Sequence, residues 1–460
     1  MGNIVGTSTP IASVDELAAT GRQFPPLREG ARVQQMDRYY RFSRDDLDLL
    51  FPGEKPRLKP GLFSDVMDFW EDAVMSDTPV IKYRDNNRAQ EFIEAIAPAI
   101  HEAARNVVGD MIRYGVGCFI NRRPLQPQSV DPRYWFPVRS ASDVSEIIAD
   151  IVAYPFVLDP NRGSPDAIRI MVYQGDEVFT SWARLEGLTI GETFDTSIAP
   201  SAAVTPEASL AVIPVVMGRG LYGTSQFGRI EAYVKEISNR ETRVSEALDK
   251  QANPHLAIPE SAIRYDEKGQ AILDLEGMMI PYPEGTDLRP QYIVWDPSFQ
   301  AQEASLQKAE QRIQELTKIS RILIDPTATG GQIPSGSALR RLAIVTVNRI
   351  RTIRGKLNEA YRDVIVGAAD LAVKSGQEGV VIERDKIHML WPPELSGGIT
   401  DDSDALSVLV NSGIIDEATA AQLVLQSSRR DAEQEAEQSD SEREMTTQGA
   451  QERANDGQDQ

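Results

Sequence analysis

The stretch 224–376 constrains the fold of this chain more than any other part of it. Over 224–253 and again over 298–324, apolar residues recur at alternating spacings of four and three. This heptad-like spacing predicts two helices that share an apolar seam. The segment 254–297 between them is rich in Pro and Gly with short apolar runs, so we expect a compact insert that contains strands. An ordinary antiparallel helix pair in a core would leave the same pattern.

A loop without charge and a long helix follow the second of these helices. The loop, 325–337, carries no charged side chain after Asp325. It contains the uncharged residues Thr327, Ala328, Thr329, Gly330, Gly331, Gln332, Ile333, Pro334, Ser335 and Gly336. A phosphate-binding loop needs Lys and then Ser or Thr after its last Gly. Ser337 and Ala338 stand there instead, so a nucleotide site is disfavoured.

The helix predicted over 338–375 is the one strongly basic element of the chain. Its basic side chains are Arg340, Arg341, Arg349, Arg351, Arg354, Lys356 and Arg362. Three interpretations of these basic side chains are open: a solvated face, nucleic-acid binding, and pairing with the carboxylates of another subunit. Because the formal net charge is -21 and acidic surfaces repel one another, we favour pairing with a neighbour's carboxylates.

The remaining segments predict an α+β fold. Residues 1–30 have little periodicity and indicate a flexible arm. The part 31–223 contains an amphipathic helix over 86–113, a buried strand around Cys118, and several short strands over 135–216. Strands are expected again within 376–396, at 380–383 and at 388–391. Two short helices are expected over 397–428, and the tail 429–460 has almost no apolar residue, which predicts disorder.

No motif in the chain indicates catalysis, a metal or a cofactor. Cys118 is the only cysteine, which excludes an internal disulfide framework. The histidines, His101, His255 and His388, are far apart and lack cysteine partners at the spacing of a zinc site. No apolar run is long enough to cross a membrane, and the N-terminus shows no signal peptide. We therefore predict a protein that is not an enzyme, with no cofactor and no membrane partner.

Several short motifs stand in a fixed order along the chain. They are Arg38-Tyr39-Tyr40, Tyr114-Gly115-Val116-Gly117, Gly223-Thr224-Ser225-Gln226-Phe227, Pro334-Ser335-Gly336-Ser337-Ala338 and Asn411-Ser412-Gly413-Ile414-Ile415. Together, over about 30–428, their order and spacing resemble the portal proteins of tailed bacteriophages, in the family typified by Bacillus phage portals. In the part 135–216, the resemblance is limited to a pattern of several short strands, without a matching motif.

The resemblance implies a ring, usually of twelve subunits, at one vertex of a capsid. Double-stranded DNA would pass through its channel during packaging and ejection, in a virion assembled in the host cytoplasm. In this portal-like subunit, 31–223 and the return strand 376–396 would form the wing, together with the long wing helix 338–375. The helices 224–253 and 298–324 would be the stem, 325–337 the tunnel loop and 397–428 the crown.

The insert 254–297 would be the clip, which in this family faces other proteins of the particle. The expected partners are the terminase large subunit and the head-tail adaptor, with major capsid or scaffolding protein elsewhere on the ring. The clip surface would present Tyr265, Asp266, Glu267, Lys268, Tyr282, Glu284, Asp287 and Arg289. Two alternatives remain open: a head-tail connector or structural interaction protein without a DNA channel, and, less favoured, a divergent nucleotide hydrolase.

Overall fold

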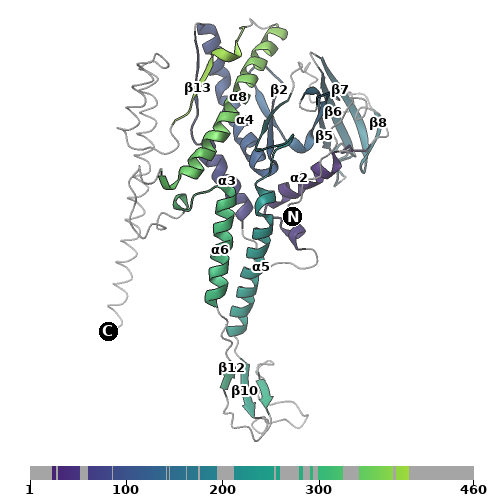
Figure 1. Ribbon diagram of the computed structural model, residues 1–460. Coiled ribbons are helices and arrows are strands. Elements are labelled where there is room, and N and C mark those ends of the chain that lie inside the picture. Colours follow the sequence, from purple (N-terminus) through teal and green to yellow (C-terminus); the bar gives the residue numbers. More distant parts are fainter. Residues whose placement is uncertain are drawn as a thin grey trace, which may run out of the picture. The chain divides into compact units, whose positions relative to one another are not determined.

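The computed structural model (Figure 1) describes most of the first 392 residues. The described residues are 23–26, 29–51, 61–84, 86–140, 142–143, 146–161, 163–174, 177–193, 212–252, 255–259, 279–282, 291–293, 299–324, 341–376 and 380–392. The chain divides into two compact units. Unit 1 comprises Met1–Tyr40, Asp65–Phe227 and Lys318–Gln460, and unit 2 comprises Arg41–Ser64 and Gly228–Thr317. The fold is mixed, with helices and mainly antiparallel sheets, as the sequence predicts.

Unit 1 contains a five-stranded antiparallel sheet in the order β4-β5-β6-β7-β8. The strands are β4 (Trp135–Arg139), β5 (Ile147–Phe156), β6 (Ala167–Gln174), β7 (Glu177–Glu186) and β8 (Thr189–Thr193). Successive side chains of a strand point to opposite faces, and alternate residues such as Phe136, Ile151 and Ile170 form one buried cluster. Phe24 and Val33, which lies in helix α2 (Gly30–Phe42), belong to the same cluster.

Two long helices cover a second sheet of unit 1, in the order β3-β2-β9. Its strands are β2 (Val116–Asn121), β3 (Pro127–Val130) and β9 (Ile213–Val216), and every residue of β2 is buried. Helix α4 (Asn87–Tyr114) and helix α8 (Ile344–Lys374) both pack on β2. Asn121 of β2 donates a hydrogen bond of 2.8 Å to the carbonyl of Val364 in α8, which fixes the helix against the sheet.

Further described elements of unit 1 are one helix, one two-stranded sheet and three turns of 3-10 helix. Helix α3 (Leu62–Met75) crosses from unit 2 into unit 1. Strand β1 (Val80–Tyr83) pairs with β13 (Ile387–Leu390) in antiparallel register, which brings the chain after α8 back beside α4. Single turns of 3-10 helix lie at Pro132–Tyr134, Arg321–Leu323 and Arg384–Lys386.

Unit 2 is built around helix α5 (Phe227–Ala252) and helix α6 (Phe299–Thr317), which run side by side in Figure 1. Buried residues of α5 follow the predicted seam at Ile230, Val234 and Ile237, and those of α6 are Ala309 and Ile313. Between the helices in sequence lie β10 (His255–Pro259), β11 (Met279–Tyr282) and β12 (Gln291–Ile293), in the order β11-β10-β12. The expected strand-containing insert is therefore present in the described part of 254–297.

The helix boundaries differ from the sequence pattern in two places. Ser43-Arg44-Asp45-Asp46 has the composition of a helix start, but the next described helical element after α2 is one 3-10 turn, Asp48–Leu50. The helix predicted over 298–324 ends at Thr317, because the next residue, Lys318, has a positive φ of 66°. Helix α8 starts at Ile344, after helical residues 341–342 and a turn at Ala343, and the predicted start at 338 lies outside the described residues.

Three predicted core or strand residues are exposed. Leu342 is 49% exposed and Leu248 is 51% exposed, although both fit the helical period of buried residues. The strand expected at 380–383 is absent, and its Val381 is 80% exposed. The return strand is formed by β13 alone, because the antiparallel register with β1 begins at Ile387.

Candidate functional site

The site singled out by the structure is the place where α4 ends and the chain enters α5. We define the α4–α5 junction as residues 110–116 and 217–227. Helix α4 ends at Gly115, whose φ is 94°, a left-handed conformation that Gly adopts readily. The carbonyl of Gly115 accepts a hydrogen bond of 2.7 Å from the N–H of Met217, and the N–H of Thr224 donates one of 2.7 Å to Met217.

Gly223 lies where these two backbone segments cross. Its φ is 69°, and a Cβ placed on it would lie 2.2 Å from the carbonyl oxygen of Gly115 and 2.5 Å from that of Met217. Real Cβ contacts are essentially never that short. The crossing therefore requires glycine for two independent reasons, conformation and space. Two motifs that lie far apart in the sequence, at Gly115 and Gly223, meet in this crossing.

The residues that precede α5 bind the end of α4. The last carbonyls of a helix have no partner within the helix. Here the N–H of Gln226 donates to the carbonyl of Ile112 over 3.0 Å, and the hydroxyl of Ser225 donates to the carbonyl of Arg113. Thr224 and Ser225 precede the first heptad helix, and hydroxyl side chains at that place typically cap the helix that follows. The hydroxyl of Ser225 instead binds the end of the preceding helix, which joins α4 to α5.

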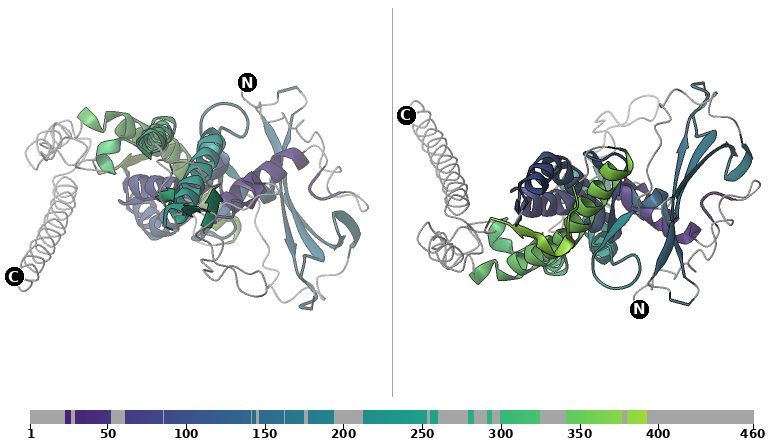
Figure 2. Two further views of the ribbon diagram at one scale, coloured as in Figure 1. Left: turned by 90° about the horizontal axis from the view of Figure 1, so that it is seen from below. Right: turned by 90° about the horizontal axis from the view of Figure 1, so that it is seen from above.

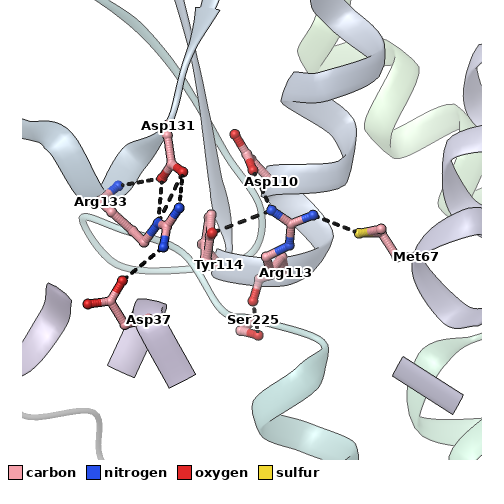
Figure 3. Close-up of polar contacts among 8 residues, drawn as sticks. All are labelled: Asp37, Met67, Asp110, Arg113, Tyr114, Asp131, Arg133 and Ser225. Carbon is pink, nitrogen blue, oxygen red and sulfur yellow. Dashed lines mark hydrogen bonds and ion pairs between the residues drawn. The ribbon is translucent and has the colours of Figure 1, made fainter. Parts of the chain in front are cut away.

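A buried network of charged side chains surrounds the junction (Figure 3). The guanidinium of Arg113 lies 3.4 Å from Asp110 Oδ1 and 3.4 Å from the hydroxyl of Tyr114, and it contacts the sulfur of Met67. The Arg113 and Asp110 side chains are only 15% and 11% exposed. Burial raises the pKa of the Asp110 carboxyl well above its usual range, and the charge of Asp131 adds to this effect. The positive charges of Arg113 and Arg133 act in the opposite direction and lower the pKa of Asp110.

Arg133 forms the second half of this network. Its guanidinium binds Asp131 through three nitrogen–oxygen contacts, the shortest 2.7 Å, and binds Asp37 of α2 at 2.9 Å. It also lies 3.8 Å from the centre of the Tyr40 ring, which is a cation–π contact. Arg113 lies 5.6 Å from the same ring. Tyr40 of the early Arg-Tyr-Tyr motif is thus held by two arginines from other elements.

A second buried ion pair fixes α2 to the same region. Arg32 and Glu29, with side chains 4% and 0% exposed, form a hydrogen-bonded ion pair. Arg32 also donates to the carbonyls of Pro132 and Trp135, over 2.9 and 2.7 Å. Its guanidinium lies 4.6 Å from the ring of Tyr222, whose hydroxyl donates to Glu29 over 3.1 Å. This pair therefore links α2, β4 and the junction segment through buried polar contacts.

Glu71 of α3 is a further acidic group close to the network. It lies against Gly109 of α4, where an added Cβ would be 2.1 Å from Glu71 Oε1. Burial, followed by the charge of Asp68, raises the pKa of Glu71 to about 6. A carboxyl with a raised pKa is costly to keep ionised, so its charge opposes folding above pH 6.

Glu71→Gln is expected to stabilise unit 1 at neutral pH. Above pH 6 the wild-type carboxylate is ionised in a half-buried place beside Asp68, and the amide removes that cost. We expect a gain of about 1 kcal/mol after allowance for solvent screening. The gain should disappear below about pH 4.5, where the carboxyl is protonated in the folded and unfolded chain alike. Thermal unfolding followed by tryptophan fluorescence at pH 7.5 and pH 4 measures it, and an equal gain at both pH values would contradict this assignment.

One arginine of the basic helix is a structural residue. Arg354 is 3% exposed and donates to the carbonyls of Val74 and Pro392, over 3.2 and 3.0 Å. It lies 4.7 Å from the ring of Trp391 and 3.7 Å from a carboxylate oxygen of Asp77. Because these contacts use its guanidinium internally, Arg354 does not belong to the exposed basic face predicted for this helix.

Burial perturbs the cysteine and one histidine among the described residues. Cys118 is buried in β2, and burial raises the pKa of its thiol well above the usual range, so the thiol stays protonated. Burial lowers the pKa of His101, which lies 3.3 Å from the hydroxyl of Tyr361. No group of three or more metal-ligating side chains occurs among the described residues. Within the same residues, no helix has the length and apolarity to cross a membrane.

Most of the predicted site residues lie outside the described residues. All of the tunnel-loop residues, Thr327 to Gly336, do so, as do the clip residues other than Tyr282. Tyr282 is the last residue of β11 and pairs with Pro259 of β10. The crown 397–428, the tail 429–460 and nearly all of the arm 1–30 are likewise outside the described residues. These assignments stay predictions.

Comparison with known proteins gives structural neighbours alone. No protein-family model matches the chain, and no curated protein does. A chain from the neck of a native GTA particle, computed with C12 symmetry, is similar at 11% identity with a TM-score of 0.42. The match covers 90% of this chain and 99% of that chain.

Two further solved structures show the same likeness. A chain from the neck of an empty GTA particle, computed with C6 symmetry, has 9% identity and a TM-score of 0.43, over 90% of this chain and 98% of that chain. A chain from the virion of a native gene transfer agent (GTA) particle has 13% identity and a TM-score of 0.40, over 80% and 95%. The function has to be inferred from the residues and elements of this chain.

Proposed function

We propose that this chain is a portal subunit that assembles into a ring through which double-stranded DNA passes. The observation that carries the proposal is the helix pair α5 and α6, which brackets the small sheet β11-β10-β12 and is followed by the long helix α8. This order is the one that the sequence motifs indicate for stem, clip and wing helix. The α4–α5 junction would hold the start of the first stem helix.

The dimensions of the helix pair suit a channel wall. Helix α5 has 26 residues, which corresponds to a length of about 39 Å. If twelve subunits each place one helix on an inner layer at about 10 Å spacing, the helix axes lie on a circle about 38 Å wide. Helix thickness leaves a bore of about 28 Å, which admits a DNA duplex.

The charge of the helix pair also supports a conduit. Helix α5 carries as many acidic as basic side chains, and α6 carries one more acidic than basic side chain. The pair is therefore close to neutral in a chain whose formal net charge is -21. A wall that neutralises phosphates with Lys and Arg would hold DNA tightly. A nearly neutral wall lets a duplex slide.

The location and partners follow from this role. The ring would sit at a vertex of the capsid, after assembly in the host cytoplasm. Its clip would bind the terminase large subunit and later a head-tail adaptor, and its outer parts would contact major capsid or scaffolding protein. The chain itself would hydrolyse nothing, since the phosphate-loop lysine is replaced by Ser337.

Negative-stain microscopy of the purified chain tests the proposal directly. We expect closed rings with a central hole, with rotational symmetry that can be counted in class averages. The mass of the ring, measured by light scattering, should be an integral multiple of the chain mass of 50.9 kDa. Monomers at all concentrations, or filaments without a hole, would overturn the proposed function.

A further inference from the structure

Gly355 is an exposed glycine in the middle of the longest described helix. A Cβ added to it would meet nothing within 4 Å, and no positive φ is involved. By contrast, Gly109 and Gly117 each lie against another element, where a Cβ would be 2.1 and 2.2 Å from its nearest neighbour. A glycine inside a helix is destabilising relative to Ala. None of the described residues accounts for Gly355, whereas close approach of a second molecule would.

The surface around Gly355 is basic. Between Asp325 and Glu359 the sequence contains no acidic residue. Residues three or four positions apart share one face of a helix, which places Arg351 and Thr352 beside Gly355 on one side and Glu359 on the other. Glu359 is an acid, but it is paired with Arg362 and Arg384. Asn348 lies one turn further along, beside Arg351 and Thr352. Asn348, Arg351 and Thr352 are exposed, and Lys356 is half-buried next to them and Gly355. We call these five residues the α8 face.

Helix α3 carries a surface of the opposite charge. Asp65, Asp68 and Asp72 are spaced by three and four residues, and all three are exposed. Helix α3 contains no basic residue. Asp72 lies 3.6 Å from Arg105 in a solvent-exposed pair, which is weak in water. We call these three residues the α3 face.

Helices α3 and α8 pack on one another within unit 1, where Arg354 of α8 donates to the carbonyl of Val74 in α3. Figure 2 shows the green helix α8 beside the purple-blue helices. The α8 face and the α3 face consist of exposed residues of these two helices. A ring of identical subunits uses heterologous contacts, in which one patch meets a different patch on the next copy. Two complementary faces on different helices of one subunit meet that requirement.

We propose that the α8 face of one copy docks on the α3 face of a second copy of this chain. Gly355 lets the neighbouring helix approach the α8 backbone closely, and Lys356 pairs with the carboxylate of Asp68. The contact reduces the mutual repulsion of strongly acidic subunits. This inference rests on the proposed ring and names the surfaces that close it.

Gly355→Leu tests the proposal because its effects on the subunit and on the ring have opposite signs. The new side chain meets nothing inside the subunit, and Leu is a better helix former than Gly, so the thermal midpoint of the isolated subunit should equal or exceed that of the wild type. In the ring the side chain overfills a close contact, and we expect the assembled fraction to fall at least about tenfold at equal concentration. Mass photometry measures the fraction. Gly163→Leu is the matched control, since a Cβ there also meets nothing within 4 Å.

A charge exchange identifies the partner surface. Lys356→Glu and Asp68→Lys should each lower the assembled fraction, because each places like charges across the contact. The double variant on one chain restores an opposite pair at every contact of the ring, and we expect most of the assembled fraction to return. Failure of the double variant to exceed both single variants would overturn the choice of α3 as the docking surface.

The outcomes separate this inference from the proposed function. Wild-type protein that forms no rings overturns the proposed function. Rings that form normally with Gly355→Leu overturn the docking contact while the ring itself stands. If those rings have also lost affinity for a double-stranded DNA oligonucleotide, measured by fluorescence anisotropy at several salt concentrations, the α8 face binds DNA rather than a second copy.

Discussion

Gly223→Ala is expected to destabilise unit 1 by about 3–5 kcal/mol, a large part of the stability of a typical domain. The methyl group would lie 2.2 Å from the Gly115 carbonyl oxygen and 2.5 Å from that of Met217. Both are backbone atoms that hold hydrogen bonds of the crossing, so neither can move without breaking one. The left-handed backbone conformation at Gly223 adds strain of about 1–2 kcal/mol for any residue with a Cβ.

Gly220→Ala is the matched control for this effect. Gly220 lies in the same segment with a φ of 87°, but a Cβ there meets nothing within 4 Å. This variant should show the conformational strain alone, about 1–2 kcal/mol. Urea unfolding followed by the fluorescence of the buried tryptophans measures both variants. If the two variants lost equal stability, the close crossing of the two segments would be wrong.

The sequence was informative where periodicity and burial agree. Helix α4 and the first half of α5, with Ile230, Val234 and Ile237, follow their predicted periods because the residues at those positions are buried. The same periodicity misled us near Leu342, which is exposed. An apolar residue on a helix gives the same pattern whether it faces the core or a second molecule. Local propensity also failed at Val381, because a strand forms only where a partner strand is in register.

The α4–α5 junction could not be predicted from the sequence in the same way. Gly115 and Gly223 appear in separate motifs, and no local rule says that their backbones cross. Asp110 and Arg113 are spaced like an ordinary surface pair on a helix, and only the fold shows that they are buried beside Asp131 and Arg133. The sequence does place an acid close to a base at Asp110 and Arg113 and again at Asp131 and Arg133. This short spacing is also common among exposed pairs, so it does not indicate burial.

Arg32→Met is expected to destabilise unit 1 by about 3–5 kcal/mol, for an electrostatic rather than a steric reason. Glu29 is fully buried, and Arg32 is its ion-pair partner. Removing one member of a buried pair leaves an uncompensated charge, which costs far more than the pair itself contributes. The carbonyls of Pro132 and Trp135 would also lose a charged donor. Thermal and urea unfolding at pH 7 measure the loss.

Two further variants show whether the buried charge is the cause. Arg32→Met combined with Glu29→Gln removes both charges and keeps an acceptor for the hydroxyl of Tyr222, so we expect it to recover more than half of the loss. Arg41→Met breaks an ion pair between α2 and Asp46, but the side chains of Arg41 and Asp46 are 44% and 37% exposed, so this variant should change stability little. A double variant as unstable as Arg32→Met alone would mean that the packing of the arginine on Tyr222, rather than its charge, holds α2 on the junction.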